Sequence, residues 1–183
     1  MPHQNVLLID RLFVALNRHD SETIASCYRD DNVVFHDIAF HITDKSRLYG
    51  MWRMICQGES GIKVTIKSMD ANDGEGEAHI IDEYRFARDA ERHKEGNAVV
   101  NEITSRFVFR DGLIEQQVDS CDERLWSKQA IGGVMGWLAG RSRFVRAWAA
   151  NRKLDKFLRD HPFPSGSVGR VRKSCQNLQD IPA

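Results

Sequence analysis

Acid, phenol, amide and hydroxyl side chains recur at alternate positions in three segments that have the two-residue period of β-strands. These six residues are Asp82 and Tyr84 in residues 77–88, Asn101 and Ser105 in residues 97–109, and Gln117 and Asp119 in residues 113–121. They share parity with Ile80, Phe107 and Cys121, so we expect them on the apolar, inward face. Burying a carboxylate without partners costs several kcal/mol of folding free energy, so carboxylates on an inward face need either partners or a functional reason. The pattern therefore favours a pocket in which carboxyl groups act as acid or base.

A second interpretation of this pattern is that the polar groups face solvent. A bulge or a one-residue shift in register would turn every one of these side chains outward. By parity alone, Glu115 would also join the inward set with Gln117 and Asp119. A lone inward aspartate is more often a satisfied core group than a catalyst, whereas polar groups on three strands make a ligand pocket about as probable as a solvated face.

The dipeptide His36-Asp37 follows a short predicted strand at residues 33–35. One interpretation is a general base at the mouth of the pocket, supplied by either residue. The other is loop polarity, with Asp37 accepting a backbone amide in an Asx turn. On the helix predicted after Thr43 or Asp44, Trp52 belongs to the core or lines the cavity, and with Phe107 it completes the predicted substrate-binding set.

The elements that must position these residues fall into a simple order. Helical periodicity predicts helices over residues 4–18, from Asp20 or Ser21 to Tyr28, and over a third segment whose Leu48, Met51, Trp52 and Ile55 share one face. Strands are predicted at residues 33–35, 62–72, 77–88, 97–109 and 113–121, with the Asp111-Gly112 turn joining the last two. Long strands joined by hairpins are antiparallel, so the fold class is α+β.

Composition limits the remaining possibilities. A length of 183 residues suits one main domain, and no apolar stretch approaches the roughly 18 residues that span a bilayer. Four cysteines without CxxC spacing, and a first segment unlike a signal peptide, favour a reduced cytoplasmic chain. The histidines lack metal-site spacing, and no phosphate-binding or dinucleotide-binding glycine motif occurs. We therefore expect neither a metal nor a cofactor.

The net charge of zero conceals a separation of charge along the chain. Residues 1–123 carry 14 Lys and Arg against 23 Asp and Glu, a balance of −9, and residues 124–183 carry 12 against 3, a balance of +9. In the basic segment, a helix over 142–159 is expected to pack a stripe of Trp148, Leu154 and Leu158 on the body or on a second subunit. Contact with an anionic membrane surface through residues 141–159 is the less favoured alternative, and nucleic acid binding is not expected.

Three regions follow from these patterns. Residues 1–123 form the main domain, residues 124–160 a basic helical extension, and residues 161–183 a flexible tail, because the segment from Pro164 to Ala183 has little apolar content.

The order of elements resembles the nuclear transport factor 2-like superfamily, which includes ketosteroid isomerase-like enzymes, polyketide cyclases and limonene epoxide hydrolase-like proteins. The resemblance rests on VALNRHDSETIASCYRDDNVVFHD (14–37), MWRMIC (51–56), EYRF (83–86), NEITSRFVFRDGLIEQQVDSCD (101–122) and RLWSKQAIGGVMGWL (124–138). It implies a cone, in which a strongly curved antiparallel sheet wraps the N-terminal helices around a deep apolar pocket. It also implies a homodimer formed through the convex face of the sheet.

The resemblance implies different site residues for each activity. In the isomerase-like members the general base follows the first strand, where this chain has His36-Asp37, and the oxyanion acid falls near Ser105, which has no carboxyl, so steroid isomerase activity is not expected. In the epoxide hydrolase-like members two carboxylates, here Asp82 and Asp119, flank an Arg, where this chain has Ile80. In the cyclases an Asp and a His move the proton.

Together these observations predict a small-molecule enzyme of the isomerase, cyclase or dehydratase type that acts on an apolar, carbonyl-bearing substrate. Asp119 or Asp37 serves as base or acid, with His36 and Asp82 as further catalytic candidates. Tyr84 and Asn101 donate hydrogen bonds to the developing oxyanion. The alternatives are a non-catalytic ligand-binding or dimerisation module and an epoxide hydrolase-like enzyme.

Overall fold

A six-stranded mixed sheet, in the order β2-β1-β6-β5-β4-β3, forms the centre of the molecule. The computed structural model describes residues 2–87, 95–131 and 143–162. Its strands are β1 (Val34–His36), β2 (His41–Ile42), β3 (Lys63–Ala71), β4 (Glu75–Phe86), β5 (Asn97–Arg110) and β6 (Leu113–Cys121). The four long strands pair antiparallel in sequence order, as their hairpins predict.

The sheet departs from the antiparallel prediction at one edge. The short strand β1 pairs parallel with β6, and β2 adds antiparallel to β1. No hairpin joins β1 to β6, because β1 follows α2 and several elements separate it from β6 along the chain. The two strands are therefore free to pair parallel. The prediction of a wholly antiparallel sheet therefore holds for β3 to β6, while the complete sheet is mixed.

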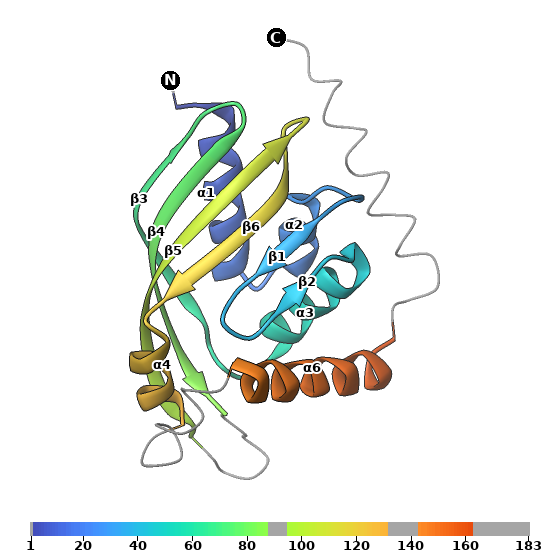
Figure 1. Ribbon diagram of the computed structural model, residues 1–183, viewed down its shortest axis with the longest axis vertical. Helices are drawn as coiled ribbons and strands as arrows, with labels where there is room; N and C mark the ends of the chain where they lie inside the picture. The colour runs from blue at the N-terminus through green and yellow to red at the C-terminus, as the bar shows by residue number, and fades with distance from the viewer. Residues whose placement is uncertain (1, 88–94, 132–142, 163–183) are drawn as a thin grey trace.

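Three N-terminal helices lie along one face of the curved sheet (Figure 1): α1 (Gln4–Asn17), α2 (Ser21–Ser26) and α3 (Lys45–Gln57). Aspartates fix the starts of the second and third, since Asp20 accepts the Thr23 amide and Asp44 accepts the Arg47 amide. The helices bury an apolar face against β3, β4, β5 and β6, and the core that results includes Ile9, Leu12, Phe13, Ile24, Tyr28, Phe35, Leu48, Met51 and Ile114, all almost completely buried.

Register decides which strand residues face the helices. β4 and β5 pair without interruption from Glu75–Val108 to Phe86–Asn97. Irregularities occur between Ile66 and Ser68 in β3 and opposite Val108 and Phe109, where the pairing passes over Glu115 of β6, before the regular pairing from Gln117 to Cys121. Bulges bend and twist a sheet, which agrees with its strong curvature in Figure 1. The predicted parity is therefore preserved where it matters for the site.

The basic extension packs on the body through the described helices α4 (Glu123–Ala130) and α6 (Arg143–Asp160). Helix α4 covers the end of β5, and α6 crosses α3 (Figure 1). In α6, Leu154 is fully buried and Leu158 packs against the core, as predicted. Trp148 does not pack on the body, because 63% of its surface is exposed, and its packing on a second subunit stays a prediction. Helical geometry explains the difference, since the buried stripe runs through Arg146, Ala150, Leu154 and Leu158 at four-residue steps.

Polar contacts secure α6 to the body. Arg47 of α3 forms an ion pair with Asp155 at 2.8 Å and donates to Asn151 at 2.8 Å. The buried Arg146 pairs with Glu123 of α4. Among the described helices, none is both long and apolar enough to cross a membrane. The predicted flexible tail from Pro164 to Ala183 lies outside the described residues.

Candidate active site

Asp82 and Asn101 face each other across β4 and β5 on the inner side of the sheet. Both are buried, with 8% and 4% of their surfaces exposed. The Asp82 Oδ1 atom is enclosed without a hydrogen-bond partner among the described residues. Burial, followed by the charge of Asp119, raises the pKa of Asp82 to about 7. Asp82 is therefore a carboxyl group that can hold a proton near neutral pH.

Asp119 of β6 lies opposite Ser105 of β5, and β5 separates it from Asp82 of β4. Its carboxylate oxygens accept from Gln117 Nε2 at 2.9 and 3.0 Å, and Gln117 Oε1 accepts from the Tyr28 hydroxyl at 2.5 Å. Burial raises the pKa of Asp119 to about 7, while the Gln117 amide and the nearby Ser105 hydroxyl oppose that rise. Ser105 Oγ lies outside hydrogen-bond geometry, so the Gln117 amide is the principal stabiliser of the ionised form.

Asp37 supplies a third carboxyl group to the same interior. It follows β1 on the parity of the buried Phe35 and accepts the amides of Ala39 and Phe40 at 2.6 and 2.5 Å. Burial raises its pKa to about 6 despite these two bonds, and its charge raises the pKa of Asp119. The Asx-turn interpretation of Asp37 is therefore confirmed, whereas its role as general base stays a prediction.

Tyr84 lies farther along β4, on the same face as Asp82. Its hydroxyl accepts a hydrogen bond from Trp126 Nε1 at 2.6 Å, and Trp126 in turn meets Phe86 edge to face. Burial raises the pKa of Tyr84, and the charges of Asp82 and Asp37 add to that rise. The phenol therefore keeps its proton at neutral pH and can donate it in a hydrogen bond.

The remaining predicted residues do not all join this cluster. His36 lies on the opposite parity from Phe35, and its Nδ1 is 3.3 Å from the Nδ1 of His41 at an exposed position. Phe107 is held in the core between Phe13 and Phe109. Trp52 meets Phe35 edge to face and is 6% exposed, and its Nε1 has no hydrogen-bond partner among the described residues. Trp52 thus borders the interior, whereas His36 lies apart from it.

Sequence reasoning did not identify two residues that support the site. Tyr28 is completely buried and bonds to Gln117, and Trp126 bonds to Tyr84. A partial indication exists in the sequence, since each is an aromatic residue with a polar atom in or beside a short helix. Such residues usually find a hydrogen-bond partner when buried. Their particular partners depend on contacts 89 and 42 residues away along the chain.

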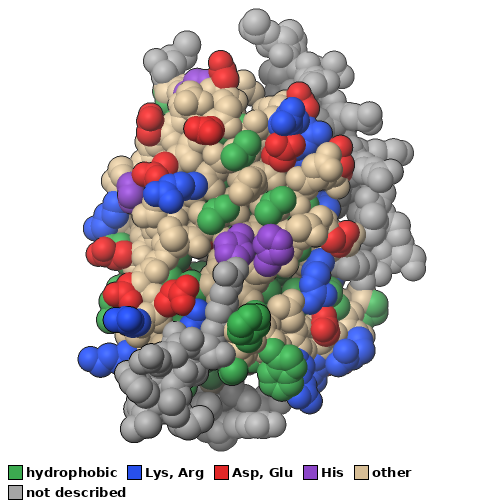
Figure 2. Space-filling view, in the orientation of Figure 1, with side chains coloured by type: hydrophobic (Ala, Val, Ile, Leu, Met, Phe, Trp, Pro, Cys, Tyr) green, Lys and Arg blue, Asp and Glu red, His purple; other side chains and the backbone are tan. Residues whose placement is uncertain are grey.

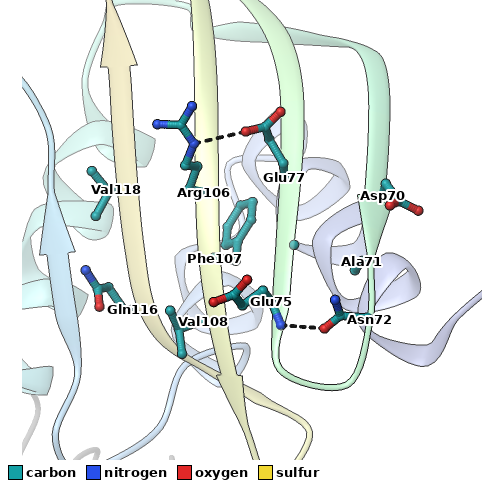
Figure 3. A pocket seen from close by; sticks show the side chains of 11 residues that line it. Asp70, Ala71, Asn72, Glu75, Glu77, Arg106, Phe107, Val108, Gln116 and Val118 are labelled. Carbon is teal, nitrogen blue, oxygen red and sulfur yellow. Dashed lines mark hydrogen bonds and ion pairs between the residues drawn. The ribbon is translucent and has the colours of Figure 1, made fainter.

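A separate hollow lies on the outer face of the sheet, away from these carboxyl groups (Figure 3). It is lined by Asp70, Ala71, Asn72, Glu75, Gly76, Glu77, Arg106, Phe107, Val108, Gln116 and Val118. Figure 3 shows Arg106 and Glu77 joined across β5 and β4, and their Nε–Oε2 distance is 3.0 Å. Glu77, Arg106, Val108 and Val118 occupy the parity opposite to the carboxyl cluster, so this hollow and the inner face are distinct surfaces.

Comparison with known proteins places this geometry in a family. Residues 9–117, more than half of the chain, match the family model of the SnoaL-like domain. The chain belongs to the SnoaL-like domain family. The SnoaL-like chain thereby falls in the nuclear transport factor 2-like superfamily, as its residues predict. No curated protein shows a significant match to it.

Solved structures share the fold of this SnoaL-like protein at low sequence identity. An epoxide hydrolase of the LEH-like type from M. tuberculosis is 20% identical, with a TM-score of 0.58 over 74% of this chain and 96% of its own. A putative polyketide cyclase from Xanthomonas campestris pv. campestris is 16% identical, with a TM-score of 0.52 over 63% and 88%. A hypothetical protein with a ketosteroid isomerase-like fold from Catenulispora acidiphila is 12% identical, with a TM-score of 0.55 over 67% and 91%.

Three carboxyl groups on the inner side of the SnoaL-like protein, those of Asp37, Asp82 and Asp119, have pKa values within about one unit of neutrality. Within the described residues, no three His, Cys, Asp or Glu side chains gather as a metal site. Groups with pKa values near the working pH are the efficient acids and bases in proton transfer. The arrangement can therefore remove a proton, hold it and return it.

Proposed function

We propose that this SnoaL-like protein is an enzyme that moves protons on an apolar, carbonyl-bearing small molecule bound at the inner face of its sheet. The observation that carries the proposal is the pair Asp82 and Asp119, one buried and one half-buried carboxyl with different surroundings. Asp119 accepts hydrogen bonds to both of its oxygens, whereas Asp82 has a buried oxygen without a donor among the described residues. Different environments for two neighbouring carboxyls divide acid and base roles between them.

The proposed step begins with Asp119 as the base. Its ionised form, stabilised by Gln117, takes a proton from the carbon next to the substrate carbonyl. The electron pair of the broken C–H bond forms a C=C bond, and the carbonyl oxygen becomes an enolate oxygen. Protonated Asp82, Asn101 and Tyr84 are the donors that stabilise this oxyanion. Return of the proton to another carbon gives isomerisation, and attack of the enolate carbon on a second carbonyl gives cyclisation.

Asp37 contributes a second charge to this step. Because its pKa of about 6 is lower than that of Asp119, it is ionised first as pH rises and holds the Asp119 pKa up. The pKa of Asp119 therefore stays close to neutral pH. A carboxylate with the low pKa of a free side chain would be fully ionised there but would be a weak base. We assign His36 no role in this step, since it lies on the other side of β1.

Deuterium incorporation tests the proposal without knowledge of the natural substrate. The protein is incubated in D₂O with a panel of apolar ketones and 1,3-diketones, and exchange of the α-hydrogens is followed by mass spectrometry. We expect exchange above buffer for at least one class, and its loss in Asp119→Asn but not in Glu83→Gln, an exposed neighbour on β4. Tight binding of a ketone without exchange would instead favour the non-catalytic ligand-binding module.

An epoxide hydrolase-like activity is the second candidate, favoured by the effect of the Asp119 charge on the pKa of Asp82. In that reaction one carboxylate activates water and the other donates a proton to the opening epoxide. Ile80, buried two residues before Asp82, occupies the position where the resemblance implies an Arg, which argues against it. Hydrolysis of apolar epoxides in H₂¹⁸O, with label in the diol, would select this activity over enolisation.

We also propose that the outer face mediates a homodimer, as the resemblance implies. The apolar Val108 and Val118 lie beside the Glu77–Arg106 ion pair in the outer hollow, a combination of apolar and paired charged groups that suits a self-complementary interface. Sedimentation equilibrium should report a dimer for the wild-type chain and a monomer for Val108→Lys/Val118→Lys. A monomeric wild-type chain would contradict this proposal.

A further inference from the structure

The outward side of α6 carries large aromatic residues that the fold leaves uncovered. Phe144 is 86% exposed and Trp148, one helical turn later, is 63% exposed. Four residues apart, the two rings lie on the same side of the helix. Large aromatic side chains that are this exposed and adjacent mark interaction surfaces in folded proteins.

The same side of α6 becomes cationic in its second half. Arg152, Lys156 and Arg159 are exposed on this side, and the exposed Lys153 lies at its flank. The acidic Asp155 on this side is engaged with Arg47 at 2.8 Å. Figure 2 shows hydrophobic side chains gathered over the start of α6, with Lys and Arg side chains beside them. From Phe144 to Arg159 the helix extends about 22 Å, so the aromatic and cationic parts form one continuous face.

We propose that this face of α6 binds the surface of an anionic lipid bilayer, with Phe144 and Trp148 inserted at the interface and the basic residues on lipid phosphates. Helices that lie in a membrane interface combine exposed aromatic and aliphatic residues with Lys and Arg. The helix is already folded on the body, since Leu154 is fully buried in the core. It therefore loses little conformational entropy when it binds.

Two details of the face fit a lipid surface. The Arg152 guanidinium lies over the Trp148 ring at 5.3 Å from its centre, so that one unit presents an apolar ring and a cation together. Indole rings prefer the headgroup level of a bilayer, where the ring contacts apolar lipid and the N–H remains hydrated. The balance of −9 in residues 1–123 opposes an approach by the body, which orients the basic helix toward the lipid.

Vesicle flotation of the full chain tests the proposal. We expect the protein to float with phosphatidylcholine vesicles that contain phosphatidylglycerol, to stay behind with pure phosphatidylcholine, and to be released by added salt. Phe144→Ser/Trp148→Ser should weaken binding by at least about tenfold. Lys153→Gln/Lys156→Gln should weaken it by about thirtyfold, at about 1 kcal/mol for each charge.

Leu7→Ser is the matched control, because Leu7 is a 55% exposed apolar residue on another helix, α1. It should bind vesicles like the wild type, and the circular dichroism of every variant should match that of the wild type. Failure of the wild-type chain to bind anionic vesicles would overturn the proposal. So would equal binding by Phe144→Ser/Trp148→Ser. If that variant instead changes the oligomeric state while no vesicle binding occurs, the face contacts protein and the proposal fails.

Discussion

Gln117 donates from one amide nitrogen to both carboxylate oxygens of Asp119, at 2.9 and 3.0 Å, while its carbonyl oxygen accepts from Tyr28. The Tyr28 bond fixes which end of the amide faces Asp119, because only the NH₂ end can donate. Tyr28 is therefore a positioning residue that acts through Gln117. The chain of three residues favours the ionised form of Asp119 against the effect of burial.

Loss of the Gln117 amide should raise the pKa of Asp119 further. Gln117→Leu removes the donor that lowers this pKa, so we expect the value to move from about 7 upward by about one unit. The acidic limb of the activity profile, which follows ionisation of the base, should shift to higher pH with it, which separates a lost hydrogen bond from simple damage. Tyr28→Phe should produce a smaller shift in the same direction. Tyr49→Phe, on the far side of α3, serves as control, and an unchanged Asp119 pKa in Gln117→Leu would refute the relay.

Removing either carboxyl of the central pair should reduce turnover strongly. Asp119→Asn and Asp82→Asn should each lower kcat by about 10² to 10⁴, the usual contribution of a general acid or base. Glu83→Gln changes an exposed carboxyl beside Asp82 and should leave kcat unchanged. Steady-state kinetics on the first substrate that exchanges deuterium measure all three. Full activity in both Asn variants would remove proton transfer by this pair from consideration.

Stability should fall as pH rises from about 4 to about 7. Asp82 and Asp119 have folded pKa values near 7, above the value of 3.8 for a free carboxyl, so the folded chain binds more protons than the unfolded chain in this range. Their favourable contribution is complete below pH 4 and is lost as pH passes through 7. Urea unfolding at several pH values measures the slope.

The Asn variants provide the control for this pH effect. Asp82→Asn/Asp119→Asn should flatten the slope between pH 4 and 7, and at pH 8 it should exceed the wild type in free energy of unfolding by about 1 to 4 kcal/mol. Equal slopes for the variant and the wild type would show that these carboxyls titrate normally.

Two residues of α6 should differ strongly in how much their truncation lowers stability. Leu154→Ala creates a cavity in the core and should cost about 2 to 5 kcal/mol of unfolding free energy. Trp148→Ala, at an exposed position on the same helix, should change stability by less than about 0.5 kcal/mol. Thermal or urea denaturation gives both values. A large loss in Trp148→Ala would show that the outward face of α6 is covered in solution.

Much of the fold is local information and is accessible from the sequence. The alternation of Ile80, Asp82 and Tyr84 places the inward face of β4 correctly, and the Asp111-Gly112 turn, with φ values of 54° and 72°, closes the β5–β6 hairpin as predicted. The site depends on the same parity, so Asp82, Asn101 and Asp119 could be grouped before their contacts were known.

The remaining features depend on packing between distant segments. Parity alone places Glu115 inward with Gln117, but the irregularity in the β5–β6 pairing passes over it, and Glu115 pairs with Arg110 on the outside while Ile114 is buried. The antiparallel pairing of the edge strand β2 with β1 sets His36 beside His41. Neither the position of a bulge nor the partner of an edge strand can be predicted reliably from the local sequence.

The most direct test of the acid–base account is a carboxyl titration by ¹³C NMR on the wild-type chain, with Asp82→Asn and Asp119→Asn used to assign the resonances. The account predicts that the Asp82 and Asp119 carboxyls titrate near pH 7, Asp37 near pH 6, and that each Asn variant lowers the pKa of the remaining partner in the pair. Titration of Asp82 and Asp119 near pH 4, with no effect of one on the other, would contradict it.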